Sequence, residues 1–414
     1  MHLIFEVVGI DFTVDYCNSH VLSQEKFCTF LILICLGITF IFCPHFSIWV
    51  IRMATPEGGS ASDNITQTCP LNANEDTIIA RGREITEYDI ESVSGFYCTG
   101  RIRFEDNQSL KVRFLKFDNG VCARKTFSRT CKCGHSRILK PYFVTYCKPM
   151  EAWIICYQWF DHLLGDQNLR IPVLANTRFA ILHYWWRNEI RELLGAIKHI
   201  HFSRCFHRAL NEICNFVVVS NKILIVNVQG SIEELENHLD FSMVRAWRLK
   251  DLAEFKDLLK FHILEPGTVW FDRDYFLDFF DSDRFGYDNF IKKLISHPFV
   301  LEPRDRMMLF FTIDRALKAD GDALIEFQSK LQGPEFYMYK RWNNNSNIVL
   351  SVYALEEIYN YRESGYDGES IWELFRFLRD VCSHSDRRIT DEEADIVVRN
   401  VYPNFLDKVY ALHY

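Results

Sequence analysis

The sequence predicts an α+β fold, with a strand-rich first half and a helix-rich second half. Residues 102–117 alternate apolar and polar side chains around an Asp-Asn turn, which is typical of a β-hairpin. Residues 185–201 instead repeat apolar side chains at helical spacing. The chain has 414 residues, of which 48% are hydrophobic and 15% aromatic. That is enough apolar material for about two to three packed domains.

The charge balance argues against binding nucleic acid through the surface as a whole. Lys and Arg number 47 against 55 Asp and Glu, so the net charge is −8. A chain of this sign has no general electrostatic attraction to phosphate backbones. Contact with RNA or DNA therefore requires a local basic site.

The N-terminal part contains a long apolar run at residues 27–51, between Lys26 and Arg52 and free of carboxylates. At ~1.5 Å per residue its 25 residues are long enough to cross a hydrocarbon core of ~30 Å. We predict a transmembrane helix here, preceded by a short segment at 1–26 and followed by a linker at 53–85. The few flanking charges favour a cytosolic C-terminal body. If Met53 is the true start, the protein is cytoplasmic.

Local patterns predict the next elements of the body. Residues 153–160 read as a buried strand, and residues 216–219 and 222–226 as two short strands. The helix at 185–201 has one apolar face, formed by Ile190, Leu193, Leu194, Ile197 and Ile200. This order of strands followed by helices is what predicts the α+β class.

The spacing of the fourteen cysteines is not that of a disulfide framework, and Cys156, Cys205 and Cys214 read as reduced buried thiols. Cys122, Cys131, Cys133 and His135 lie close together in the sequence. Their spacing is tighter than that of paired zinc knuckles, and no second knuckle follows. We therefore expect a cysteine-bearing loop and no metal site.

The residues after the 185–201 helix resemble the catalytic-loop region of a protein kinase. His207-Arg208-Ala209-Leu210 matches H-R-D-L, and the stretch 227–230 (NVQG) falls where D-F-G is expected. By this resemblance Ala209 stands at the base position and Cys214, with Asn215 one residue late, at the metal-binding Asn. Asn227 or Val228 stands at the metal-binding Asp.

The start of the kinase-like region departs from the family pattern as well. Gly95-x4-Gly100 is a remnant of a glycine-rich loop, and Arg113 aligns best with the lysine of the third strand. The resemblance implies a degenerate two-lobed kinase-like fold over 86–297 that has lost phosphoryl transfer. By this resemblance, neither ATP nor ADP is expected as a bound cofactor.

The C-terminal part, residues 298–414, resembles the kinase-extension nuclease (KEN) domain. That family comprises the kinase–endoribonuclease sensors of the unfolded protein response and the 2-5A-dependent ribonuclease. The junction is marked by His297-Pro298-Phe299, Pro303, Arg306 and Asp314-Arg315, and the closing signature lies at 402–410 (YPNFLDKVY). The resemblance implies an all-helical ribonuclease domain.

Residues 366–379 (YDGESIWELFRFLR) align without gaps to Y-x-x-x-S-V-R-D-L-L-R-x-x-R, and His384 follows five residues later. Ser370 and Glu373 form a capping box, so we predict a helix that begins at Ile371. Its buried stripe is Ile371, Leu374, Phe375, Leu378 and Cys382. The family places catalysis at the positions of Tyr366, Arg379 and His384, with Asn where this chain has Asp380.

The resemblance implies cleavage of RNA by its own 2′-hydroxyl, without a cofactor or metal, leaving a 2′,3′-cyclic phosphate. It also implies a homodimer and a single-pass location in the endoplasmic reticulum membrane through residues 27–51. One alternative is a catalytically silent pseudokinase scaffold that dimerises with an active relative. Two others are an active kinase with an unorthodox site and a gene model that adds residues 1–52 and truncates the kinase lobe.

Overall fold

The computed structural model describes residues 3–7, 10–14, 67–70, 79–80, 83–94, 97–166, 171–176, 181–234, 241–264, 270–282, 286–345, 353–361, 365–384 and 389–413. Its contacts divide the chain into two units, Met1–Ala61 and Ser62–Tyr414. In the first unit, β1 (Leu3–Val7) and β2 (Ile10–Val14) form an antiparallel hairpin. The predicted transmembrane segment at 27–51 lies outside the described residues. Within them, no helix is long and apolar enough to cross a membrane.

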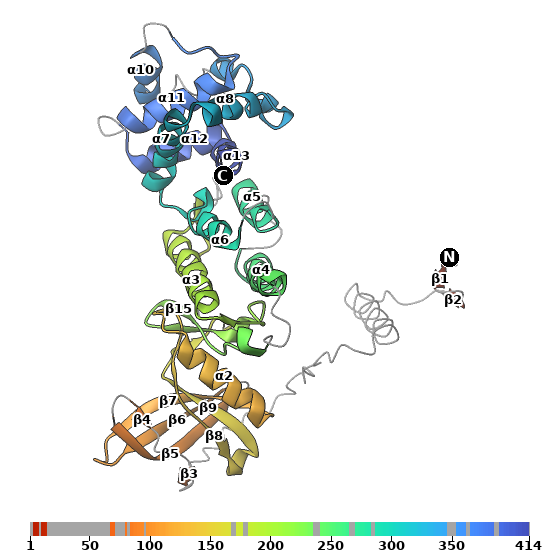
Figure 1. Ribbon diagram of the computed structural model, residues 1–414, viewed down its shortest axis with the longest axis vertical. Coiled ribbons are helices and arrows are strands. Elements are labelled where there is room, and N and C mark those ends of the chain that lie inside the picture. The colour runs from red at the N-terminus through yellow and green to blue at the C-terminus, as the bar shows by residue number, and fades with distance from the viewer. Residues whose placement is uncertain are drawn as a thin grey trace, which may run out of the picture. The chain divides into compact units, whose positions relative to one another are not determined.

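The second unit begins with a curled antiparallel sheet of seven strands (Figure 1). The order along it is β3-β5-β6-β7-β9-β8, and β4 also pairs with β5. The strands are β3 (Gln67–Pro70), β4 (Ile79–Ala80), β5 (Arg83–Ser94), β6 (Tyr97–Phe104), β7 (Ser109–Phe117), β8 (Pro141–Cys147) and β9 (Ala152–Gln158). The predicted hairpin at 102–117 and strand at 153–160 are therefore present.

One segment differs from the sequence prediction. The linker predicted over 53–85 contains strands β3 and β4 and the first residues of β5. Both short strands pair with the long strand β5, whose backbone N–H and C=O groups on that side have no other strand beside them. Backbone pairing of this kind leaves no apolar period in the sequence, so periodicity does not reveal it.

Helix α2 (Gly120–Lys132) connects β7 to β8 and packs on β7, β8 and β9 (Figure 1). Asn119 caps its start, because the side chain accepts hydrogen bonds from the amides of Val121 at 2.8 Å and Cys122 at 3.2 Å. The helix contains no Asp or Glu. It therefore offers no carboxylate to a cation on the sheet.

Helix α3 (Tyr184–Phe202) confirms the prediction for 185–201, and all five residues of its predicted apolar face are fully or almost fully buried. Beyond it, β14 (Phe216–Val219) and β15 (Lys222–Ile225) form the predicted pair of short strands. Short strands complete this part: β10 (His162–Leu163), β11 (Leu174–Asn176), β12 (Ile181–Leu182), β13 (Cys205–Phe206) and β16 (Gly230–Ser231).

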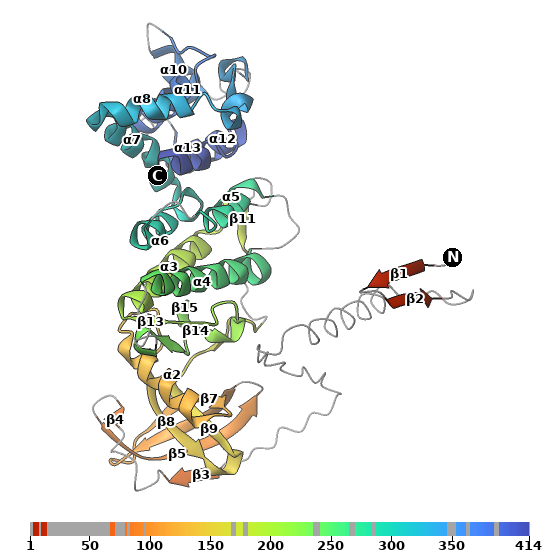
Figure 2. The same ribbon diagram turned by 45° about the vertical axis from the view of Figure 1, so that its right-hand side comes forward.

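The rest of the described second unit is helical. Figure 2 shows α4 (Phe241–Leu258) beside α3, with which it is in contact. The chain continues through a π-helical turn (Leu259–Ile263), α5 (Phe271–Phe279), α6 (Tyr287–Ile295) and the 3-10 turn η5 (Pro298–Val300). An antiparallel sheet followed by a helical part is a mixed α+β architecture, consistent with the expected kinase-like fold. We call residues 86–297 the kinase-like region.

From residue 298 to 413, the described residues form helices and no strand. We call this part the helical region. Its elements are α7 (Pro303–Ala319), α8 (Gly321–Lys330), η6 (Pro334–Tyr339), η7 (Trp342–Asn345), α10 (Tyr353–Tyr361), α11 (Ile371–His384), α12 (Asp391–Val401) and α13 (Phe405–His413). One hydrophobic cluster includes residues of both regions, from Ile190 on α3 to Phe405 on α13. The core is therefore continuous across the boundary at residue 297.

Candidate functional site

The loop after α3 is held by one buried carboxylate. Asp251, on α4, accepts hydrogen bonds from the backbone amides of His207 at 2.7 Å and Arg208 at 2.8 Å. It also accepts one from Nε2 of His201 at 2.8 Å. Burial alone would raise the pKa of Asp251, but the hydrogen bonds and the nearby His201 lower it below its usual value. The backbone of the loop is thus fixed without help from the side chain at position 209.

The polar residues at the degenerate kinase positions bond to one another. The hydroxyl of Tyr157 donates to Oδ1 of Asn227 at 3.0 Å, and Nδ2 of Asn227 donates to Oδ1 of Asn215 at 3.0 Å. Nδ2 of Asn215 then donates to the carbonyl of Ala209 at 2.9 Å. Val228 is fully buried in the core. The side chains that face the loop are therefore Asn215 and Asn227.

None of these groups is a carboxylate. Phosphoryl transfer needs a carboxylate to take up the substrate's proton and another to hold Mg²⁺ on the phosphates. Ala209 has no titratable group, and the Asn215–Asn227 pair is neutral. Cys214 is half-buried, and burial raises the pKa of its thiol, so the metal-favouring thiolate form is disfavoured.

Arg113, on β7, is held by backbone carbonyls and aromatic rings. It donates to the carbonyls of Phe160 and Asp161, each at 3.2 Å. Its guanidinium lies 4.1 Å from the ring centroid of Trp159 and 4.4 Å from that of Tyr97. Burial lowers the pKa of Arg113. The sequence of α2 contains no Asp or Glu, so this helix offers no carboxylate to Arg113.

Gly100 has a structural role and lies in the middle of strand β6. A Cβ at this position would lie 1.9 Å from the carbonyl oxygen of Asp89 on β5. The close approach of the neighbouring strand therefore requires glycine. Gly95, the other half of the proposed glycine-rich remnant, lies outside the described residues.

The second site is built on α11 of the helical region. The helix begins at Ile371 as predicted, and the hydroxyl of Ser370 accepts a hydrogen bond from the amide of Glu373 at 3.3 Å. Four of the five residues predicted to form its buried stripe are buried, and Cys382 is partly buried. Arg379 and Asp380, which follow the buried Leu378, are half-buried.

Asp380 joins the candidate catalytic residues in one cluster. Its Oδ2 accepts a hydrogen bond from the hydroxyl of Tyr366 at 2.9 Å. Its Oδ1 accepts hydrogen bonds from two nitrogens of Arg379, Nε at 2.8 Å and Nη2 at 2.5 Å. Tyr366 precedes Asp380 by 14 residues in the chain, so only the fold brings the two together. Three of the four predicted site residues are therefore adjacent.

The sequence did not single out Asp314 as a site residue, although it contributed to the family resemblance. Asp314, on α7, accepts a hydrogen bond from Arg379 at 3.1 Å and one from Lys318 at 2.7 Å. Arg379 thus lies between two carboxylates. Burial alone would lower its pKa, but Asp380 and Asp314 raise it above the usual value. The guanidinium stays charged and paired.

His384 is the last residue of α11. Its side chain lies outside the described part of the chain. The backbone places it one turn beyond Asp380, at the end of the helix that carries Arg379.

The cysteine cluster of the sequence separates along α2 and its end. Cys122 and Cys131 are exposed, while Cys133 is buried against the core that includes Cys205. Among the described residues, no group of three or more His, Cys, Asp or Glu is arranged to hold a metal ion.

Comparison with known proteins adds only a weak structural likeness. No protein-family model and no curated protein matches the chain. Similar solved structures include the crystal structure of Rad53 1-466 in complex with AMP-PNP, at 15% sequence identity and a TM-score of 0.35. The match covers 51% of this chain and 64% of the other, so the chain spans less than two thirds of the Rad53 chain. A likeness at this level assigns no family.

Proposed function

We propose that the helical region is an endoribonuclease that cleaves RNA through its own 2′-hydroxyl. The observation that carries this proposal is the meeting of Tyr366 and Arg379 at one carboxylate, on the helix that ends with His384. Proton transfer near neutral pH suits histidine, and a guanidinium suits phosphate. The chemistry needs both kinds of group within reach of one phosphodiester.

In the proposed reaction the 2′-oxygen attacks the adjacent phosphorus while the bond from phosphorus to the 5′-oxygen breaks. One proton leaves the 2′-hydroxyl and one proton is delivered to the 5′-oxygen, so the products are a 2′,3′-cyclic phosphate and a 5′-hydroxyl. His384 and Tyr366 are the candidates for these proton transfers. Arg379 is the candidate for binding the charged phosphate.

The kinase-like region serves in this proposal as a regulatory and dimerisation platform that no longer transfers phosphate. The neutral pair Asn215 and Asn227 and the missing carboxylate at Ala209 support it. The chain would act as a homodimer, anchored in a membrane through residues 27–51 with its body in the cytosol. Sedimentation of the purified protein tests the homodimer directly.

The test of the nuclease is cleavage of a labelled stem-loop RNA by the full chain in EDTA. Tyr366→Phe removes one hydroxyl and should lower the rate by roughly tenfold or more, because a group that touches the substrate is lost. Tyr402→Phe is the matched control, since its buried hydroxyl has no hydrogen-bond partner among the residues that the structure describes. Equal cleavage by Tyr366→Phe and wild type would remove Tyr366 from the mechanism.

A second candidate function is a silent scaffold that dimerises with an active relative. It is favoured by the pairing of Arg379 with both Asp380 and Asp314, which competes with any phosphate. A scaffold forms dimers but leaves the RNA intact at every protein concentration. If wild type and Asp380→Asn both dimerise without cleaving RNA, the scaffold replaces the nuclease.

A further inference from the structure

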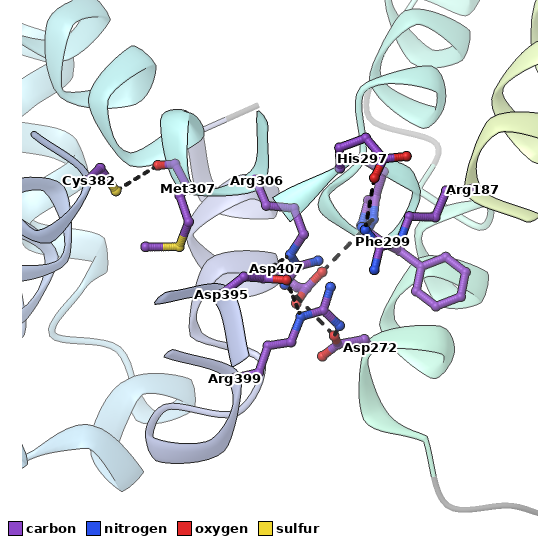
Figure 3. A network of polar contacts seen from close by, with 11 residues as sticks. Arg187, Asp272, His297, Phe299, Arg306, Met307, Cys382, Asp395, Arg399 and Asp407 are labelled. Carbon is purple, nitrogen blue, oxygen red and sulfur yellow. Dashed lines mark hydrogen bonds and ion pairs between the residues drawn. The ribbon is translucent and has the colours of Figure 1, made fainter. Parts of the chain in front are cut away.

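A buried group of charged side chains joins the kinase-like region to the helical region (Figure 3). Arg306, on α7, is 2% exposed and donates Nε to Oδ1 of Asp395 on α12 at 2.9 Å. Arg399, one turn further along α12, donates Nε to Oδ2 of Asp395 at 3.0 Å. Arg399 also bonds to Asp272 on α5, which belongs to the kinase-like region. Two arginines and two aspartates therefore pair across three helices.

A third arginine completes the charge balance. Arg187, on α3, is 3% exposed and forms an ion pair with Glu302 at 3.4 Å. Burial, together with Arg399 and Arg306 nearby, lowers its pKa to about 10, so it remains charged at neutral pH. Three arginines thus face three carboxylates. Because these arginines are already paired, they neutralise a further negative charge among the described residues of this group only in part.

Asp407, on α13, is a further carboxyl group that takes no part in these three pairings. It is 1% exposed, and neither of its oxygens accepts a hydrogen bond from another described residue. Nδ1 of His297 lies 4.0 Å from its Oδ1. That nitrogen accepts a hydrogen bond from the amide of Phe299 at 3.2 Å, so it carries a lone pair and cannot donate to Asp407.

The surroundings of Asp407 favour its neutral form. The titratable and charged groups that face it from the neighbouring elements are Asp272, Tyr275, His297, Arg306, Tyr339 and Arg399. Burial and Asp272 raise the pKa of Asp407 to about 7, and Arg306 and Arg399 offset only part of this rise. Burial also lowers the pKa of His297 far below its usual value, so the imidazole stays neutral.

We propose that Asp407 is protonated in the folded protein and acts as a proton-dependent latch between α13 and the kinase-like region. A neutral carboxyl packs among α5, η5 and α7, which α13 contacts. Ionisation puts an unpaired charge into this buried site and weakens the packing. The proposal concerns the junction alone and does not depend on RNA cleavage.

The direction of the pH effect follows from the raised pKa. A carboxyl that is easier to protonate when folded stabilises the protein most below the pKa of the unfolded state, 3.8. That stability is lost as the pH rises through the folded value of about 7. Above it, folded and unfolded chains carry the same charge at this position, and the contribution stays constant.

The experiment measures the melting temperature of the full chain between pH 5 and pH 8.5, for wild type and Asp407→Asn. The amide is neutral at every pH, so the variant should lose the downward step and melt roughly 5 °C or more above wild type at pH 8. The difference should shrink as the pH falls toward 5, because the folded carboxyl of wild type is then protonated as well. Asp278→Asn, an exposed substitution on α5, is the matched control and should keep the wild-type step.

A second variant tests the titration of Asp407 without replacing that residue. Asp272→Asn removes a negative neighbour and leaves Arg399 less neutralised, so the downward step should move to lower pH. An Asp407→Asn curve parallel to wild type overturns the latch. So does a step that stays at the wild-type pH in Asp272→Asn. If Asp407→Asn does not fold, the wild-type and Asp272→Asn curves decide the question.

Discussion

The two candidate sites of this chain differ in how their polar groups are satisfied. In the kinase-like region, neutral amides form a chain from Asn227 through Asn215 to the carbonyl of Ala209. In the helical region, Arg379 lies between the charged groups Asp380 and Asp314. The polar side chains of the first site are neutral and form hydrogen bonds to one another. The second site pairs one arginine with two carboxylates.

We propose that the kinase-like site lacks its reaction, whereas the helical site is restrained by its own ion pairs. A neutral hydrogen-bonded network is inexpensive to bury and has no means to hold Mg²⁺. A partly buried charge cluster is costly unless its members are paired, and pairing can be undone by a competing phosphate. We therefore expect that no single substitution gives the kinase-like site phosphoryl transfer, whereas one substitution can change the charge balance of the helical site.

His384→Ala carries the largest expected effect on the helical side of the comparison. If His384 transfers a proton, RNA cleavage should fall by ~10²–10⁴-fold, the usual contribution of a general acid or base. Initial rates on a labelled stem-loop RNA measure the effect. His262→Ala, an exposed histidine of the kinase-like region, should leave the rate unchanged. Unimpaired cleavage by His384→Ala would show that another group carries the proton.

Arg306→Met tests the junction that both regions share. Removing the buried guanidinium leaves Asp395 with one partner fewer, and breaking a buried pair typically costs about 3–5 kcal/mol of unfolding free energy. Urea unfolding followed by circular dichroism measures the loss. Arg341→Ala is the control, because its ion pair with Glu369 is exposed and such pairs contribute about 0–1 kcal/mol. Equal losses in the two variants would mean that the buried network does not stabilise the junction.

Asp380→Asn tests whether the helical site is restrained by its own carboxylate. The amide keeps a hydrogen-bond acceptor for Tyr366 but removes the negative charge beside Arg379. Cleavage should rise by a factor of about two to five, since removing one incompletely buried charge interaction changes the free energy by about 0–1 kcal/mol. Asp322→Asn, on the exposed first turn of α8, controls for net charge. A decrease in rate would instead assign Asp380 an active part in the reaction.

Ala209→Asp should have the smallest effect. It restores a carboxylate at the base position but supplies neither a metal ligand at Asn227 nor a glutamate on α2. We expect no incorporation of labelled phosphate from ATP and magnesium, in wild type or in the variant. Incorporation that Asn227→Ala abolishes would contradict the loss of phosphoryl transfer.

Much of the fold could be predicted from the sequence, because its main elements have strong periodicity. The 102–117 hairpin and the apolar face of α3 follow from local patterns that tertiary packing then reinforces. Strands β3 and β4 were missed, since two to four residues that pair through their backbone leave no period. The continuous core across residue 297 could not be seen in any local window.

The candidate site shows the same limit. The capping box gave the start of α11, and helical spacing placed Arg376 and Arg379 on its more polar flank. The contact of Tyr366 with Asp380 was implied only by the family resemblance, because a loop separates the two residues. The pairing of Arg379 with Asp314 spans 65 residues, and neither propensity nor spacing carries that information.

The anchoring of the 207–208 backbone by Asp251 has a consequence for how the chain tolerates mutation. The amides of His207 and Arg208 are held by a residue on α4, and the side chain at Ala209 forms none of these hydrogen bonds. A substitution at position 209 should therefore leave these bonds in place. Loss of Asp251 would instead leave two backbone amides and Nε2 of His201 without their acceptor. A protein without the chemistry of this loop would therefore still need Asp251 to hold the loop's backbone.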